Sequence, residues 1–235
     1  MHKRSLARRS AAEFFGTLFL VAAVIGSGIM AERLSNGNVA LALLANTIAT
    51  GAALVALILA FGPISGAHLN PAVSLMDAFE AGLPWLEVPH YVICQVVGGI
   101  AGALAAHLMF GLPIITLSGH IRSGPAQFFS EFVATFGLLC VIWGSSRLRA
   151  ESTPFAVGAY ITAAYWFTSS TSFANPAVTL ARCLSNTFTD IRPADVGWFI
   201  LAQLIGAFAA TLLFRWLAPA LSAQAGNVLV VHNEE

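Results

Sequence analysis

The sequence predicts an all-α membrane protein with six transmembrane helices and two short half-helices, arranged in two inverted repeats. Three observations support this prediction. Charged residues make up 9% and hydrophobic residues 57% of the 235 positions, whereas soluble domains carry about 25% charged residues. Six apolar runs are each long enough to cross a bilayer. The triplet Asn-Pro-Ala occurs twice, each time in a short segment between such runs.

A helix that crosses a bilayer needs about 20 apolar residues. The first run is too long for the core of a signal peptide, so we expect a retained span. The fifth run is the shortest. The six predicted spans are Ala11–Ala31, Val39–Phe61, Pro89–Phe110, Ala126–Ser146, Phe155–Thr171 and Val196–Leu217.

Each triplet is a helix start signal, because Asn is a favoured N-cap and Pro fits the first helical position. The two triplets are Asn70-Pro71-Ala72 and Asn175-Pro176-Ala177. The cap uses the Asn side-chain oxygen and leaves its NH2 group free to donate. We expect short helices over Pro71–Glu80 and Pro176–Asn186. Each would be about 15 Å long, so the pair would span the hydrocarbon core of about 30 Å.

The two halves of the chain repeat one another. Glu13-Phe14-Phe15 matches Glu131-Phe132-Val133, and the two triplets match. Each half holds three spans and one half-helix, and three is odd, so the second copy enters the membrane inverted. We therefore predict a channel domain at 11–217, with repeat one at 11–110 and repeat two at 126–217. A basic N-terminal segment, 1–10, precedes it, and a polar tail, 218–235, follows it.

The placement of Lys and Arg predicts the orientation. Seven basic residues fall on one side of the spans and four on the other, and four of the seven precede the first span. The positive-inside rule then puts both termini in the cytoplasm of an integral membrane protein. The net charge is zero, so no basic surface for nucleic acid is expected.

Other chemistry is not indicated. The three cysteines and six histidines are scattered, which predicts neither a disulfide framework nor a metal site. No nucleophile–base pair and no phosphate-binding glycine loop is evident, so we expect neither an enzyme nor a cofactor. Small residues at matching places, Gly98 with Gly102 and Gly206 with Ala210, predict close helix packing.

These features resemble the aquaporin family, the major intrinsic proteins, over residues 11–217. The resemblance rests on the two triplets, the inverted six-span pattern, Ser65-Gly66-Ala67-His68 before the first triplet, and the pair Glu13 and Glu131. It implies the aquaporin fold and a homotetramer of independent pores in the lipid bilayer that pass small uncharged solutes. It also implies that Asn70 and Asn175 donate hydrogen bonds to the solute, while the positive ends of the half-helices repel cations.

The chain departs from the family pattern directly after the second triplet. Most members carry arginine there, and this chain has Val178. Counting back from the triplets places Thr50, Ala163 and Ser172 at the other positions of the outer constriction, with Phe173 as the alternative to Ser172.

These small side chains predict a wide, uncharged outer constriction that passes water and larger neutral solutes such as glycerol, urea or arsenous acid. The sequence is similar to a bacterial subfamily linked with arsenic detoxification, in which valine follows the second triplet. We therefore expect the protein in a bacterial plasma membrane.

Glu13 and Glu131 are carboxylates within apolar spans, where an unpaired charge costs about 3 kcal/mol. The resemblance implies that each one braces the loop before a half-helix by accepting backbone N–H bonds, which loops at membrane depth require. The competing interpretation is a proton relay in an ion-coupled transporter.

Two further residues are candidates for the pore vestibules. His68 precedes the first triplet and either lines the cytoplasmic pore or is a packed histidine. Arg182 lies four residues after Val178, so it faces the same side of the half-helix one turn outward. It either restores a positive charge there or reaches the lipid headgroups.

Three functions follow from these features. The first is a passive channel for neutral solutes. The second is an ion-coupled secondary transporter built on inverted repeats, and the third is a junctional membrane protein that conducts little.

Overall fold

The computed structural model describes residues 4–218, except the side chains of residues 147 and 148. Nearly all of the predicted C-terminal tail, 218–235, and the first three residues of the predicted basic segment lie outside the described residues. Within the described part the chain is helical and contains no strand.

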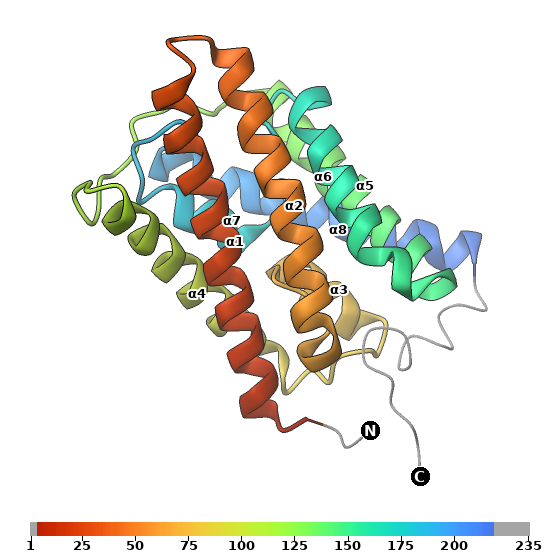
Figure 1. Cartoon of the computed structure of the whole chain (residues 1–235). Helices are drawn as coiled ribbons and strands as arrows, with labels where there is room; N and C mark the ends of the chain where they lie inside the picture. Colours follow the sequence, from red (N-terminus) through yellow and green to blue (C-terminus); the bar gives the residue numbers. More distant parts are fainter. Residues whose placement is uncertain (1–3, 219–235) are drawn as a thin grey trace.

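Six long helices form the frame of the molecule (Figure 1). They are α1 Leu6–Leu34, α2 Val39–Ser65, α4 Val88–Met109, α5 Pro125–Leu148, α6 Thr153–Phe167 and α8 Pro193–Leu217. Two short helices, α3 Pro71–Phe79 and α7 Pro176–Arg182, start at the Asn-Pro-Ala triplets, and a 3-10 turn, Ala150–Ser152, precedes α6. The predicted fold class is confirmed.

Several predicted boundaries are corrected. Helix α1 starts at Leu6, so residues 6–10 of the predicted basic segment 1–10 are part of this helix. Helix α6 has only 15 residues, or about 22 Å, while the other five frame helices are long and apolar enough to cross a membrane. Helix α7 ends at Arg182 rather than at Asn186, because the chain turns there and Ser185 N–H donates to the Arg182 carbonyl.

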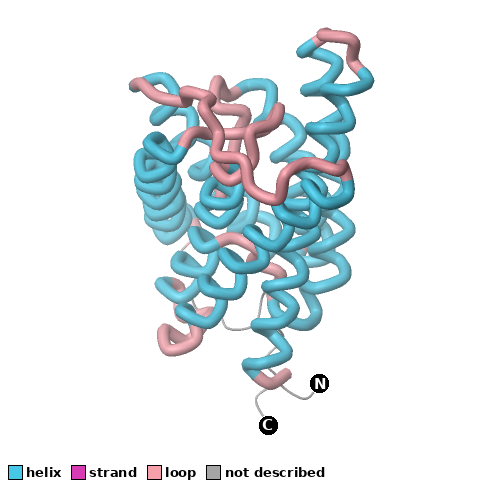
Figure 2. The backbone as a smooth tube through the Cα atoms, turned by 90° about the vertical axis from the view of Figure 1, so that its left-hand side faces the viewer, coloured by secondary structure: helices cyan, strands magenta, loops and turns pink. Residues whose placement is uncertain are grey.

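The two repeats are built alike. Helix α1 packs along α4 in the first repeat and α5 packs along α8 in the second, while α2 packs on α6 between the repeats. In Figure 1 the half-helix α3 lies in the lower part of the molecule and α7 in the upper part, so they enter from opposite ends. Figure 2 shows non-helical chain inside the helical frame as well as at its ends.

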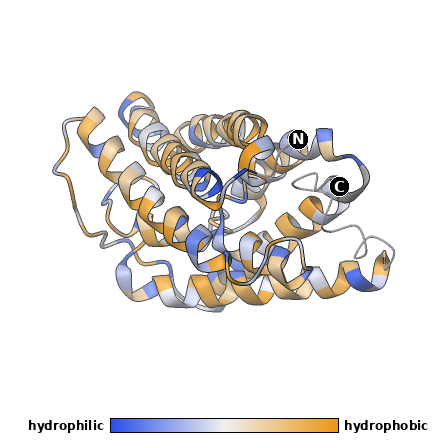
Figure 3. Ribbon diagram, turned by 90° about the horizontal axis from the view of Figure 1, so that it is seen from below, coloured by the Kyte–Doolittle hydropathy of each residue, from blue (hydrophilic) through white to orange (hydrophobic). Residues whose placement is uncertain are grey.

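The outer surface of the frame is apolar, as a lipid-facing surface must be. Hydrophobic colouring dominates the helices when the bundle is seen from below (Figure 3). Large apolar side chains at least half exposed occur on helices of both repeats. Examples are Phe19, Ile48, Ile93, Phe155 and Trp198.

Glycines allow the paired helices to touch, as predicted. A Cβ added at Gly98 would lie 2.3 Å from the Phe14 carbonyl oxygen of α1, and one added at Gly102 would lie 2.3 Å from that of Leu18. A Cβ added at Gly206 on α8 would lie 2.5 Å from the Phe132 carbonyl oxygen of α5. Side chains at these positions would push the helices apart.

Gly102→Ala is therefore expected to destabilise the protein by about 1–3 kcal/mol, as overpacking does. Gly197→Ala is the matched control, because a Cβ at this helical glycine of α8 meets nothing within 4 Å. Thermal unfolding in detergent should show a lower midpoint for Gly102→Ala alone. Equal midpoints would contradict the packing argument.

Candidate functional site

The two Asn-Pro-Ala triplets meet at the centre of the molecule. The Asn70 Nδ2 group donates to the Ala174 carbonyl at 2.8 Å, and the Asn175 Nδ2 group donates to the Leu69 carbonyl at 2.7 Å. Each acceptor is the residue directly before the opposite triplet. The two repeats are thus joined by a reciprocal pair of hydrogen bonds.

Each asparagine also caps its own half-helix. Asn70 Oδ1 accepts the Ala72 N–H at 2.9 Å, and Asn175 Oδ1 accepts the Ala177 N–H at 3.0 Å and the Val178 N–H at 3.3 Å. Both caps have extended backbone and Pro follows each at the first helical position, which is the local geometry that Asn-Pro favours.

The amide groups are less free than the sequence predicted. An NH2 group has two hydrogens, and one of them is used for the bond between the repeats. One hydrogen on each asparagine therefore remains for a solute. Both asparagines line the central cavity described below.

Glu13 of α1 holds the loop that leads to α3. Its Oε1 accepts hydrogen bonds from the Ser65 hydroxyl at 2.6 Å and the His68 N–H at 3.0 Å. Its Oε2 accepts from the Leu69 N–H and the Gln95 amide, both at 2.7 Å. Both oxygens of this fully buried carboxylate are therefore occupied.

Glu131 of α5 holds the corresponding loop of the second repeat. Its Oε1 accepts from the Phe173 N–H at 2.9 Å, and its Oε2 accepts from the Ala174 N–H at 2.9 Å and the Gln203 amide at 2.7 Å. The carboxylate in each repeat thus accepts hydrogen bonds from two loop amides and one glutamine, and Glu13 has the Ser65 hydroxyl as a further donor.

The braced loops have unusual backbone geometry. Ala67 and Leu69 have φ of 45° and 50°, and Ser172 and Ala174 have φ of 48° and 49°. L-residues rarely adopt this left-handed region, and each such residue costs free energy that the surroundings must offset. The hydrogen bonds to the two glutamates fix these loops, which directs both asparagines to the same point.

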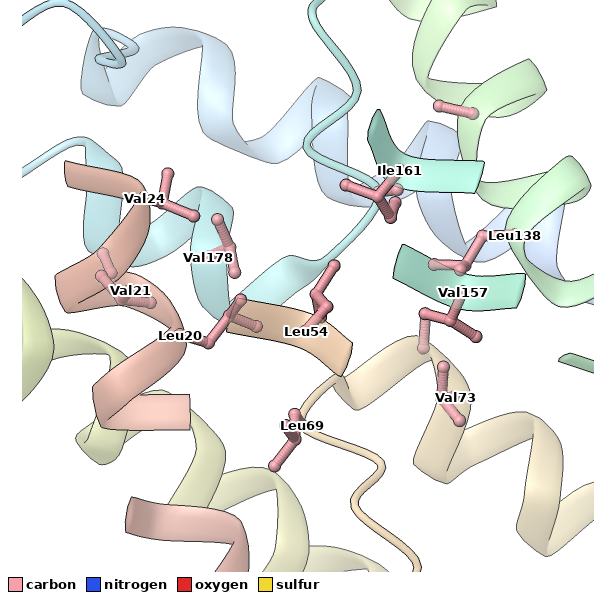
Figure 4. Close-up of a cluster of buried hydrophobic side chains, with 14 of the residues drawn as sticks. Leu20, Val21, Val24, Leu54, Leu69, Val73, Leu138, Val157, Ile161 and Val178 are labelled. Carbon is pink, nitrogen blue, oxygen red and sulfur yellow. The ribbon is translucent and has the colours of Figure 1, made fainter. Parts of the chain in front are cut away.

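A narrow cavity of about 90 Å³ passes this point. It has room for a few water-sized molecules, well below the size of a typical ligand pocket. Its wall is mostly apolar and is contributed by α1, α2, α5, α6 and both half-helices. Figure 4 shows several of these side chains, among them Leu20, Leu54, Val157 and Val178, directed toward a common region.

Of the residues predicted for the constriction, one does not line the cavity. Thr50, Ser172, Phe173 and Val178 line it, so the alternatives Ser172 and Phe173 both reach the wall. Ala163 does not line it and is exposed on the outer side of α6. This assignment is corrected.

The residue of α6 that reaches the wall near Thr50 is Tyr165. It lies two positions after Ala163 and lines the cavity, and its hydroxyl donates to Thr50 Oγ1 at 3.3 Å. Val157, Ile161 and Tyr165 follow one another at intervals of four residues on the inward face of α6. Ala163 lies on the opposite face, so counting back from the triplet selected the wrong side of the helix. The wall is thus bulkier here than predicted.

Arg182 also lines the cavity and is only 1% exposed. Its guanidinium carbon lies 3.3 Å from the centroid of the Phe173 ring, and its Nε donates to the Thr189 carbonyl. A side chain buried in this way does not reach lipid headgroups, so that interpretation is wrong. The other interpretation, a positive charge at the cavity wall one turn beyond Val178, is the one that this position favours.

His68 lines the other end of the cavity and is 8% exposed. Its Nδ1 lies 3.0 Å from the Ser74 hydroxyl, and its Nε2 lies 3.5 Å from an oxygen of Asp77. The histidine is thus both a wall residue and a packed residue with polar neighbours.

The six-helix frame, the two opposed half-helices and the central cavity define an integral membrane protein of the inverted-repeat channel class. Comparison with known proteins agrees. The model of the major intrinsic protein family matches residues 1–170 and again 144–234. The chain belongs to the major intrinsic protein family.

Relatives support the same assignment. The chain is 56% identical over 217 residues to aquaglyceroporin AqpS of Rhizobium meliloti (strain 1021), covering 92% of this chain and 93% of the relative. It is 33% identical over 210 residues to aquaporin NIP1-1 of Zea mays, covering 86% of this chain and 73% of that protein.

A solved structure, the aquaglyceroporin from Plasmodium falciparum, matches with a TM-score of 0.70 and 21% identity, covering 93% of this chain and all of that one. At this identity the match shows the fold.

Glu131→Ala should reduce both stability and transport, because it removes the acceptor of two loop amides and one glutamine amide. Each unsatisfied buried donor costs about 1–3 kcal/mol, so the expected loss is about 3 kcal/mol or more.

Thermal unfolding in detergent and solute flux in proteoliposomes measure the two effects. Glu32→Ala is the control, because Glu32 is exposed at the end of α1. A stable Glu131→Ala variant with normal flux would show that the brace is dispensable.

Proposed function

We propose that the chain is a passive channel for water and larger neutral solutes, selected at the meeting of the two triplets. The observation that carries this proposal is the cavity that both repeats line, with one free amide hydrogen on each of Asn70 and Asn175. Members of its family are channels and not enzymes, so the chain is a channel protein.

The geometry explains how such a channel selects neutral molecules. A water molecule that crosses lipid must be offered replacement hydrogen bonds, because an unsatisfied polar group costs several kcal/mol there. A water that accepts one bond from each asparagine points its own hydrogens away from both, and this opposes proton hopping. The N-terminal ends of α3 and α7 add positive potential at the same place, which repels cations.

Val178 bears on which solutes pass. It lines the cavity with a short apolar side chain, at the position where the resemblance to the family implies an arginine. We propose that glycerol, urea and arsenous acid pass as well as water. The similarity to a bacterial protein whose name identifies it as an aquaglyceroporin supports the larger substrates.

The other two functions are less well supported. An ion-coupled transporter needs titrating groups, and both oxygens of Glu13 and of Glu131 already accept hydrogen bonds from fixed donors. A junctional protein that conducts little needs no cavity through the centre. Uphill uptake abolished by an uncoupler would favour the transporter.

We further propose a homotetramer in the bacterial plasma membrane with both termini cytoplasmic. The apolar surface on helices of both repeats supports membrane embedding. Arg215 pairs with Glu80 at the end of α3, and Arg9 pairs with Glu87 at the start of α4, in the same short connection. The start of α1 and the end of α8 thus lie at one end of the molecule, which carries the basic residues expected of a cytoplasmic face.

Light scattering on proteoliposomes tests the function. Purified full-length protein should accelerate shrinkage and reswelling with glycerol, urea and arsenous acid as well as water, relative to empty liposomes. Water flux with exclusion of every larger solute would refute the proposed width. The absence of any flux would favour the junctional function.

Val178→Arg should lower the size limit, so that glycerol and arsenous acid flux fall more than water flux. Arginine adds both bulk and a positive charge at the cavity wall. Val178→Leu is the matched variant, because it adds bulk without charge. Unchanged solute selectivity in Val178→Arg would show that this position does not set the limit.

A further inference from the structure

We propose that Arg182 adds a second barrier to cations, beyond the half-helix ends, and orients solutes at the outer end of the pore. It would carry, one helical turn farther out, the positive charge that the position after the second triplet lacks. This inference rests on the proposed channel function and extends it to a named specificity-determining residue.

The position of Arg182 is suited to this role. It lies four residues after Val178 on α7, which is about 6 Å farther along the helix axis. Both residues line the same cavity. A solute that moves between the outer solution and the asparagines must therefore pass the guanidinium before it passes Val178.

The guanidinium has a hydrogen-bond partner at Nε and none at its two terminal nitrogens within the described residues. Its Nε donates to the Thr189 carbonyl, and its plane lies against Phe173, with the carbon 3.3 Å from the ring centroid. Cation–π contacts of this kind stabilise and orient arginine. Within the described part of the chain, neither terminal nitrogen makes a hydrogen bond, so up to four N–H donors remain for a solute.

Phe173 is itself held in place. Its ring packs edge-on against Phe199, with centroids 5.2 Å apart, and its N–H donates to Glu131. The loop brace thus positions the aromatic platform on which Arg182 rests. The unpartnered hydroxyl of Ser172, the preceding residue, lies in the same wall and adds a further polar group.

No carboxylate in the described residues neutralises this charge by contact. Asp190 lies 2.9 Å from His120 Nδ1, and Asp195 forms a two-bond ion pair with Arg192 at 2.8 and 2.9 Å. A second buried cation, Arg122, lies 5.0 Å from the Phe173 centroid and donates to backbone carbonyls rather than to a carboxylate side chain. Asp190 and Glu131 interact electrostatically with both arginines but, among the described residues, form no ion pair with either, so the two guanidiniums place positive charge at this end of the cavity without a carboxylate contact.

A purely structural role does not account for this arrangement. Burying an uncompensated charge costs several kcal/mol, and a packing role would be served by an apolar or ion-paired residue. The cost falls when water in the pore solvates the guanidinium. The donors that it offers match hydroxyl and carbonyl oxygens, so the class of solute is a small neutral hydroxylated or carbonyl compound.

Two variants separate the charge from the hydrogen-bond geometry. Arg182→Gln removes the charge and keeps a polar side chain. It should raise the leak of sodium ions or protons by about tenfold or more, because a charge that lines a narrow cleft changes local ion concentration by that order. Arg182→Lys keeps the charge without the planar fork. It should exclude cations like the wild type and pass glycerol more slowly.

Both fluxes are measured on the full-length protein in proteoliposomes, glycerol by light scattering and protons with a trapped pH dye under an imposed potential. Arg192→Gln is the matched control, because this arginine is ion-paired and lies outside the cavity wall. It should behave as the wild type. The double variant Val178→Arg with Arg182→Gln should restore cation exclusion, because the charge returns to the wall one turn inward.

The outcomes distinguish this proposal from the channel function. Wild-type protein that passes no neutral solute would overturn both. If the wild type passes glycerol and the Arg182→Gln variant leaks cations no faster than the wild type, the role of Arg182 alone is overturned. If Arg182→Gln does not fold, Arg182→Lys decides, and a cation leak above the wild type in that variant would equally overturn it.

Discussion

The architecture depends on satisfying the backbone of two non-helical loops inside a membrane protein. Peptide groups at that depth have little water to bond with, so irregular chain persists there only with partners. Glu13 and Glu131 supply them, each accepting two loop amides and a glutamine side chain. A buried carboxylate is normally a liability, and here the donors that surround it also hold the left-handed residues of both loops.

Fixing these loops determines the centre of the pore. Because hydrogen bonds to the glutamates hold the loops, Asn70 and Asn175 lie close enough for each to donate to the loop of the other repeat. That reciprocal pair uses one hydrogen of each NH2 group, and both asparagines line the cavity. The same side chains thus join the repeats, start the half-helices and line the cavity.

One end of the cavity carries the charge of Arg182 although the residue directly after the second triplet, Val178, is uncharged. The side chain directly after the second triplet is apolar, yet Arg182 brings a guanidinium to the wall one turn away. Phe173 supports it and Thr189 anchors its Nε. The cluster at this end is thus drawn from the loop, the half-helix and the segment that follows it, rather than from a single position.

The sequence by itself determined the spans, the inverted repeat, the two capped half-helices and the paired glutamates. These features follow from local chemistry: apolar length, cap preference and the cost of charge in lipid. Only the tertiary structure decided that Tyr165 and not Ala163 reaches the wall, since the packing of α6 against α2 and α5 decides which face of that helix turns inward. It also decided that Arg182 is buried against Phe173 and that one hydrogen of each asparagine is already used. Those outcomes depend on contacts between segments far apart in the chain, which helix periodicity and cap chemistry do not encode.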